Sequence, residues 1–212
     1  MGSNNCNELA RLAEEIKKCR KCTLYLSRKN AVPGEGPCNA DVMFVGEAPG
    51  SKEDETGRPF VGAAGKLLMQ LLELIGLKRS DVYITNVVKC RPPNNRDPTP
   101  EEIEACSPYL IRQIKIIKPK IIVALGRHSA RFLFSRAGLK WSNMRRMHGK
   151  VFSARIDGVE VKIMATYHPA AALYSPKLRP DLENDFRVLE SLIHGIHGKS
   201  TTKYRTILDF LK

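Results

Sequence analysis

The apolar positions of the chain form short runs that alternate with stretches of helical periodicity. Runs of strand length lie at 41–45, 82–88, 120–125, 150–155 and 159–165, the last two joined by the turn Asp157-Gly158. Helical spacing predicts helices over 63–76, 100–116, 127–135 and about 182–193, preceded by a short amphipathic helix containing Leu9, Leu12 and Ile16. Such repeated strand–helix units predict an α/β fold of three layers, αβα, around a central, mainly parallel four-stranded sheet.

The length and the charge limit the number of domains and the kind of partner. A chain of 212 residues suits one domain, which we expect over 1–195 with the N-terminal helix included, followed by a polar tail at 196–212. Thirty-five Lys and Arg against 22 Asp and Glu give a net charge of +13, which favours a polyanionic partner such as nucleic acid over a merely lysine-rich surface. No apolar run has the length of a membrane span and the N-terminus does not match a signal peptide, so we expect a cytoplasmic protein.

The loop at 46–62, GEAPGSKEDETGRPFVG, is the most informative stretch. It follows an apolar strand and precedes a helix, and the carboxyl ends of strands are where open α/β sheets bind ligands. Glu47, Glu53 and Asp54 bring carboxylates into the loop, and Phe60 offers an aromatic face. These residues predict a site that holds a planar polar ring by stacking and hydrogen bonding.

Two further polar residues lie where predicted strands pass into loops. The amide of Asn86 can accept from one ring atom and donate to the next, which suits the N3–H and O4 of uracil but not cytosine; the alternative is an Asn that only caps the strand. His168, before Pro169, is placed to face the ligand crevice. We assign His128 and His148 to structural or surface positions. The basic segment 139–150 is either a phosphate-contact surface or a solvated loop.

Four of the six cysteines form a possible metal site: the pair Cys19 and Cys22, and the distant Cys90 and Cys106. Four thiolates can bind tetrahedral zinc or an iron–sulfur cluster, and the spacing alone does not choose between them. The basic flank at 17–21 should lower thiol pKa values, which argues against four unrelated buried thiols. Cys6 and Cys38 are left either as a disulfide or as free thiols.

Taken together, the loop 46–62, TNVVKCRPP at 85–93, YHPAA at 167–171 and the four cysteines resemble the family 4 uracil-DNA glycosylases. These are the thermostable, iron–sulfur branch of their superfamily. The resemblance implies a monomeric base excision repair hydrolase that flips uracil out of single- or double-stranded DNA. It would cleave the N-glycosidic bond, release free uracil and leave an abasic site. It also favours a [4Fe–4S] cluster on Cys19, Cys22, Cys90 and Cys106 over zinc.

The resemblance assigns roles to individual residues. Phe60 would stack on the flipped uracil, Asn86 would read N3 and O4, and His168 would face O2 as a catalytic donor. Glu47 would be the second catalytic residue, orienting or deprotonating the attacking water or stabilising the sugar cation. The loop around the base and the attacking water matches Gly46, Glu47 and Ala48. Glu53 matches the position that would reject the methyl group of thymine at C5.

Alternatives remain open at this point. One is an iron–sulfur module that binds uracil-DNA without catalysis or covalently, although 91–98 lacks the histidine of the covalent branch. Another is a zinc-stabilised enzyme for a different nucleobase. The tail is similar to a sliding-clamp-binding peptide or else forms an ordinary C-terminal helix; the residues that would bind the clamp are Tyr204, Ile207, Phe210 and Leu211.

Overall fold

The computed structural model describes residues 2–196. Its strands are β1 Val42–Gly46, β2 Tyr83–Asn86, β3 Ile121–Leu125, β4 Val151–Ile156 and β5 Val159–Thr166. Its helices are α1 Gly2–Lys17, α2 Ser51–Thr56, α3 Ala63–Leu74, α4 Pro100–Ile117, α5 Arg127–Arg136, α6 Met144–Met147, α7 Pro169–Tyr174 and α8 Arg179–Ile196. The α/β class and every predicted long element are thus confirmed.

Within the described residues the strands form one five-stranded sheet in the order β2-β1-β3-β5-β4. The first four strands are parallel, and β4 runs antiparallel to β5 at the edge. The prediction of four strands was therefore wrong by one, and the prediction of a mainly parallel sheet is confirmed. The extra strand follows from the turn at Asp157 and Gly158, both with positive φ, which folds β4 back onto β5.

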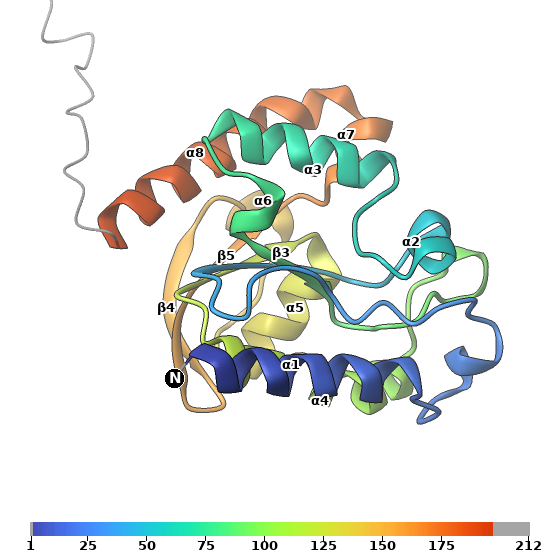
Figure 1. Ribbon diagram of the computed structural model, residues 1–212. Coiled ribbons are helices and arrows are strands. Elements are labelled where there is room, and N and C mark those ends of the chain that lie inside the picture. Colours follow the sequence, from blue (N-terminus) through green and yellow to red (C-terminus); the bar gives the residue numbers. More distant parts are fainter. Residues whose placement is uncertain (1, 197–212) are drawn as a thin grey trace, which may run out of the picture.

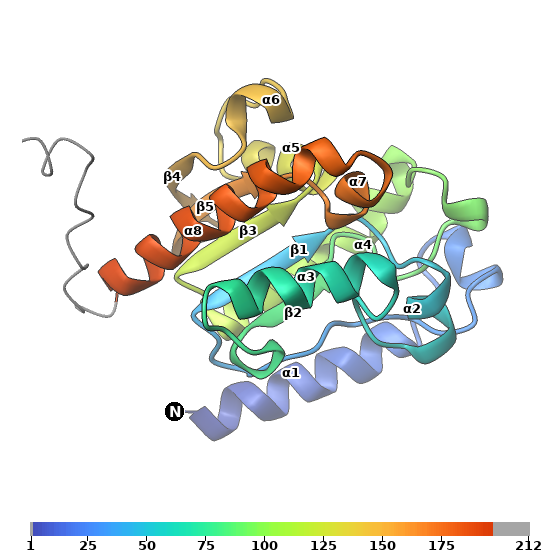
Figure 2. The same ribbon diagram turned by 90° about the horizontal axis from the view of Figure 1, so that it is seen from above.

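Helices cover both faces of the sheet (Figures 1 and 2). On one face α3 and α8 pack with Val42 and Phe44 of β1, and on the other α1, α4 and α5 pack with Met43 and Val45. Alternate residues of a strand point to opposite faces, so both sides of β1 are apolar. The three predicted layers are confirmed.

The short helices α2, α6 and α7 were not predicted. Each has six residues or fewer, which is too short to give a helical repeat in the sequence. In contrast, the start of α4 has the capping box that its sequence predicts. The Thr99 side chain accepts from the amide of Glu102, and the Glu102 carboxylate accepts from the amide of Thr99 at 2.8 Å.

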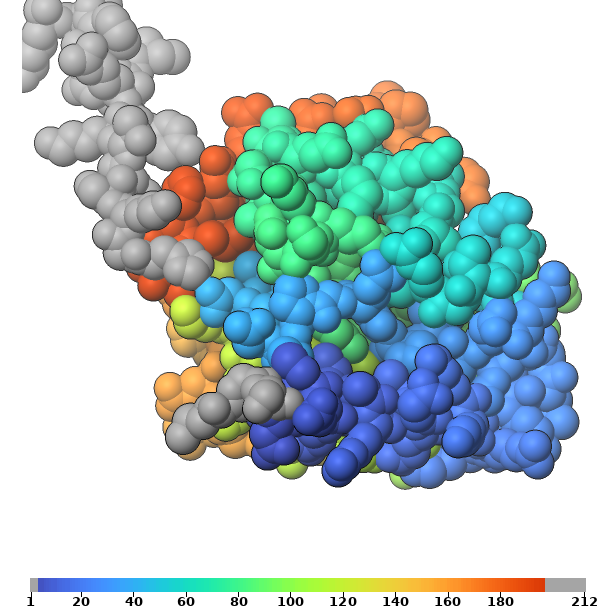
Figure 3. Space-filling model, in the orientation of Figure 1, coloured from blue at the N-terminus to red at the C-terminus, as the bar shows by residue number. Residues whose placement is uncertain are grey.

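The N-terminal segment is fixed to the domain by a disulfide between Cys6 and Cys38. This outcome decides between the two alternatives left by the sequence. The bond joins α1 to the segment before β1, and closing a loop of 32 residues in the unfolded chain contributes roughly 3–4 kcal/mol in the chain-entropy account. In the space-filling view, the blue N-terminal residues cover the lower part of the molecule (Figure 3).

The remaining sequence predictions on overall organisation concern the membrane and the tail. None of the helices within residues 2–196 is long and apolar enough to cross a membrane. The proposed clamp-binding residues Tyr204, Ile207, Phe210 and Leu211 lie outside the described residues, as does nearly all of the 196–212 tail.

Candidate active site

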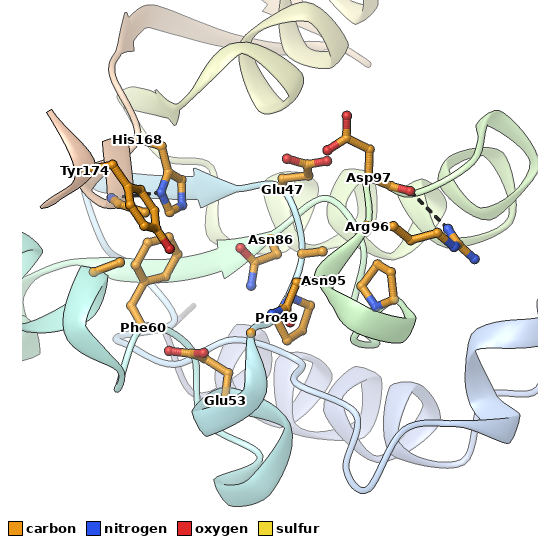
Figure 4. A pocket seen from close by; sticks show the side chains of 15 residues that line it. Glu47, Pro49, Glu53, Phe60, Asn86, Asn95, Arg96, Asp97, His168 and Tyr174 are labelled. Carbon is orange, nitrogen blue, oxygen red and sulfur yellow. Dashed lines mark hydrogen bonds between the residues drawn. The ribbon is translucent and has the colours of Figure 1, made fainter. Parts of the chain in front are cut away.

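A cavity of about 390 Å³ opens at the carboxyl ends of the parallel strands (Figure 4). Its walls come from the loops after β1, β2 and β5, which are far apart in sequence. The predicted site residues that line it are Glu47, Ala48, Glu53, Phe60, Asn86 and His168. The three sequence motifs therefore meet in one place, because parallel strands end at the same edge of a sheet.

Gly46, the last residue of β1, comes directly before the lining residue Glu47 and has no room for a side chain. It pairs with Asn86 in the register of β1 and β2. A Cβ atom at Gly46 would overlap with Asn86 Oδ1 and lie 2.8 Å from the Phe60 ring. The absence of a side chain at Gly46 thus lets the amide of Asn86 and the ring of Phe60 come together.

Asn86 is only 1% exposed, yet its side-chain oxygen accepts no hydrogen bond within the described part of the chain. A buried acceptor without a donor costs about 1–3 kcal/mol. The backbone carbonyl of Asn86, by contrast, accepts from Lys89 Nζ at 2.6 Å. The side-chain oxygen therefore does not cap the strand and is available to a donor on a ligand.

His168 presents an N–H group to the cavity. Its Nδ1 accepts from the backbone amide of Ala170 at 3.1 Å and so caps α7, which places the ring hydrogen on Nε2. Burial lowers the pKa of His168 to about 4, with Glu53 opposing the shift, so the ring is neutral at pH 7. Its ring centroid lies 5.6 Å from that of Phe60 (Figure 4).

Phe60 is held in a strained backbone conformation, with φ of 50°. This region costs a bulky residue on the order of 1–3 kcal/mol, so the surroundings must hold it in place. Glu53 Oε1 accepts from the amides of Val61 and Gly62, both at 2.9 Å. Gly65 allows α3 to approach, because a Cβ there would overlap with the Phe60 carbonyl.

Glu47 lies across the cavity from the two rings, next to Asp97 (Figure 4). Burial, and then the charge of Asp97, raise the pKa of Glu47 to about 7, while Arg127 lowers it. Its buried Oε1 has no hydrogen-bond partner within the described residues. Glu47 is thus a carboxyl group that changes charge near neutral pH.

His128 is a neighbour of Glu47, although the sequence predicted a structural or surface position for it. Its Nδ1 lies 3.8 Å from Glu47 Oε1, and its Nε2 lies 3.1 Å from Asp97 Oδ2. Burial lowers the pKa of His128 and the charge of Asp97 opposes that shift, while Nε2 also lies 2.8 Å from Arg127 Nε. No local pattern signals this contact, which joins the start of α5 to the loop after β1.

His148 meets the expectation of a structural residue. Its Nδ1 lies 2.9 Å from Asp185 Oδ1, and Asp185 also accepts from Thr166 at 2.6 Å. This cluster fixes the end of the basic segment 139–150 to the core. Whether that segment contacts phosphate or is a solvated loop stays a prediction.

The four remaining cysteines form a second site, away from the cavity. Their thiols are free, and all of them line one small pocket: Cys19, Cys22, Cys90 and Cys106. Three donors already point at sulfur: Arg28 donates to Cys90 Sγ at 2.9 Å, the amide of Lys89 to Cys106 Sγ at 3.2 Å and the amide of Lys21 to Cys19 Sγ at 3.5 Å. Segments 62 or more residues apart are therefore brought together at these thiols.

The prediction about the basic flank was wrong. Lys21 lies over the ring of Tyr109 at 4.9 Å, and Arg20 lies near the ring of Tyr25, rather than at the thiols. Burial raises the pKa of Cys22 and Cys90 and, most strongly, that of Cys106, to about 12. The cations that act on the thiols are Arg28, for Cys22 and Cys90, and Lys89, for Cys106, and desolvation outweighs their effect.

Comparison with known proteins identifies the class. The family model of the Uracil DNA glycosylase superfamily matches residues 33–189, which contain all three motifs around the cavity. The chain belongs to the Uracil DNA glycosylase superfamily.

Individual relatives narrow the assignment. The chain is 57% identical to the type-4 uracil-DNA glycosylase of Sulfurisphaera tokodaii, over 88% of this chain and 85% of that protein. It is 52% identical to that of Archaeoglobus fulgidus, over 94% of this chain and 97% of that protein. Identity to a type-5 uracil-DNA glycosylase of Pyrobaculum aerophilum is lower, 34% over 78% of this chain and 76% of that protein. The chain belongs to the type-4 uracil-DNA glycosylases.

Proposed function

We propose that this protein removes uracil from DNA by hydrolysing the N-glycosidic bond, as the names of its relatives indicate. The observation that carries the proposal is the unpartnered, buried oxygen of Asn86 beside Phe60 and His168. A planar base with an N–H group would satisfy that oxygen. A base within a duplex cannot reach a cavity at this depth, so the nucleotide must first rotate out of the stack.

Recognition of uracil follows from the amide of Asn86. Its oxygen accepts from uracil N3–H, and its NH₂ group donates to O4. Cytosine has an acceptor at N3 and a donor at C4, so it would leave both groups unpaired. Phe60 supplies the stacking face, and Glu53 limits space at C5, in addition to holding the amides of Val61 and Gly62.

Bond cleavage sends the electron pair of the C1′–N1 bond into the base. Negative charge then develops on uracil O2, where His168 Nε2–H donates a hydrogen bond. Such a donor contributes roughly 2.7–4 kcal/mol at a developing oxyanion. Water adds to C1′ next to Gly46 and Ala48. Glu47 in its ionised form takes the proton of that water, orients it or stabilises the sugar cation.

The first experiment measures free uracil released from an oligonucleotide with one uracil. Release with an intact sugar–phosphate strand supports the proposal. Binding of the oligonucleotide without release of uracil would favour a non-catalytic uracil-DNA-binding module. A covalent adduct between protein and DNA would favour a module that binds uracil-DNA covalently. Release of another base but not of uracil would indicate a different substrate.

The same assay across pH 5–9 tests Glu47. Because its pKa is raised to about 7, the carboxylate forms only as the pH rises through that value. We expect kcat/KM to rise about tenfold per unit below pH 7 and to level off above it. Glu47→Gln should be slow and lack this rise, whereas Glu8→Gln, at an exposed position of α1, should keep it. An unchanged pH profile in Glu47→Gln would contradict the assignment.

We propose a [4Fe–4S] cluster on Cys19, Cys22, Cys90 and Cys106. The donor set fits an anionic group, since the guanidinium group of Arg28 donates to Cys90 Sγ, the backbone amide of Lys89 donates to Cys106 Sγ, and the positive charge of the buried Lys89 side chain favours the thiolate of Cys106. Tetrahedral zinc would bring the sulfurs within about 3.8 Å of one another. Within the described residues, the one group of three or more possible ligands whose ligand atoms all lie within 4.8 Å of one another is Glu47, Asp97 and His128. No three of the four cysteine sulfurs are therefore that close together. When bound, such a cluster supplies cross-links between distant segments rather than chemistry at the base.

Metal analysis tests this assignment. We expect about four iron atoms and four sulfides per chain, with visible absorption typical of an iron–sulfur protein. Cys106→Ser should lose iron and absorption. Cys38→Ser, which breaks the disulfide and leaves the four thiols in place, should keep both. Stoichiometric zinc without iron, or iron retained in Cys106→Ser, would contradict the proposal.

Other expectations rest on the family or on sequence alone. They are the monomeric state, the thermophilic origin, the cytoplasmic location, the division at residue 195 and clamp binding by the tail. For the residue that fills the emptied duplex position, Tyr174 and Leu173 are suitable, since they are 90% and 47% exposed at the end of α7, beside His168.

A further inference from the structure

The segment Pro33–Pro37, sequence PGEGP, lies outside the residues that line the cavity and has an unusual backbone conformation. Gly34 and Gly36 have φ of 128° and 141°, which residues with a side chain rarely adopt. A Cβ at Gly36 would also overlap with the carbonyl of Val82, and one at Gly34 would lie 2.9 Å from Thr85. The two glycines thus press the residue between them, Glu35, against β2.

The backbone of Glu35 is bonded to β2 in both directions. Its amide donates to the carbonyl of Ile84 at 2.9 Å, and its carbonyl accepts from the amide of Ile84 at 2.8 Å. Ile84 lies two residues before Asn86 on the same strand. Glu35 therefore has a fixed position relative to the amide that reads the base.

The carboxylate of Glu35 joins two arginines. Arg58 donates to both of its oxygens, at 2.9 and 2.8 Å, and Arg79 lies 3.3 and 3.4 Å from them. The two guanidinium groups hold the pKa of Glu35 down, at about 2. Glu35, Arg58 and Arg79 thus form one ion-pair cluster, the brace.

The brace ends at Phe60. Arg79 donates to the carbonyl of Pro59 at 2.6 Å and to that of Phe60 at 3.2 Å. These bonds fix two consecutive peptide groups on either side of the strained Phe60 Cα. Glu53 binds the two amides that follow, so the backbone is held from both directions. The Arg79 side chain is only 22% exposed, which limits competition from water.

We propose that Arg79 is a positioning residue that sets the stacking ring of Phe60 at a fixed place relative to Asn86. The chain of contacts runs from β2 through Glu35 to Arg79 and on to the Phe60 backbone. Arg79 touches no base and takes no part in bond cleavage. This role deepens the proposed function and depends on it, because it concerns how the base slot is built.

The geometry requires arginine. Two carbonyls and one carboxylate are bound by one side chain, and only a planar fork with several N–H groups can reach all three. Lysine, with one ammonium group, can keep the charge and part of the bonding. The structure therefore distinguishes the two basic residues at this position.

The test is a double-mutant cycle on uracil release. Arg79→Met should lower kcat/KM roughly tenfold, equivalent to about 1.4 kcal/mol. Arg79→Lys should recover part of the loss, and Arg187→Met, at an exposed position of α8, should have no effect. In a Phe60→Ala background, Arg79→Met should change kcat/KM by less than about twofold, because the ring it positions is gone. A tenfold loss in both backgrounds would overturn the proposal.

A second measurement does not depend on activity. With 4-fluorophenylalanine at position 60, fluorine NMR should show one resonance in the otherwise unchanged protein. Arg79→Met should add a second resonance or broaden the first, while the melting temperature shows that the domain stays folded. A single unchanged resonance would overturn the proposal. If the protein releases no uracil, the proposed function fails, and this measurement still reports on the brace.

Discussion

The Asn86→Asp variant is expected to lose roughly a thousandfold or more in uracil release. Aspartate has nearly the shape of asparagine, so the cavity keeps its form next to Gly46. The carboxylate, however, has no N–H group for uracil O4. It also places a negative charge beside the base on which the departing electron pair accumulates. Losing one donor at a developing oxyanion costs about 10²–10³ in kcat, and the added charge increases the loss.

Single-turnover release with enzyme in excess measures this effect on the chemical step. The matched control is Asn184→Asp, the same change at an exposed position of α8, which should leave the rate unaltered. Circular dichroism melting separates loss of catalysis from loss of folding. If Asn86→Asp keeps its rate to within tenfold, then Asn86 does not read the base, and its orphaned oxygen has another role.

The second large effect is expected for His168→Ala, with a loss of about 10²–10³ in the rate of release. The substitution removes the Nε2–H group that faces the base, and with it the donor to uracil O2. Because burial lowers the pKa of His168 to about 4, the wild-type ring donates as a neutral group throughout pH 5–9. Its titration therefore adds no step to the pH profile above pH 5.

His168 also caps α7, so a second variant keeps the test specific. His168→Gln retains a side-chain N–H donor and should recover part of the activity lost in His168→Ala. His194→Ala, at an exposed position of α8, is the control and should behave as wild type. Equal losses in His168→Ala and His168→Gln would indicate that the ring acts through its shape or its cap rather than through its donor. No loss in either variant would remove His168 from the mechanism.

The core of the site could be predicted because its residues lie at the carboxyl ends of strands. Glu47 and His168 come after apolar runs and Asn86 ends β2, and parallel strands bring such positions to one edge. Phe60 was found for a related reason, since it ends the loop that leaves β1. The local sequence thus contained both the residue types and their approximate meeting point.

Supporting residues could not be predicted in the same way. His128, Arg79 and Lys89 act through contacts distant in sequence: His128 meets Glu47, Arg79 meets Phe60 and Lys89 meets Gln113, which are 81, 19 and 24 residues away. Their own surroundings in sequence are ordinary basic or helical stretches. The pKa values of Glu47 and His168 likewise depend on burial by several segments at once, which no single stretch contains.

What the sequence by itself determined is the α/β architecture, the three motifs and the four thiols, because hydrophobic period and residue chemistry are local properties. The tertiary structure alone decided that Cys6 pairs with Cys38, that the predicted pair of strands at 150–165 joins the sheet at its edge, and which cations reach the thiols. It also decided that Phe60 adopts a strained backbone held by Arg79 and Glu53. These features depend on distances between segments far apart in the chain, and such distances are fixed only when the layers pack.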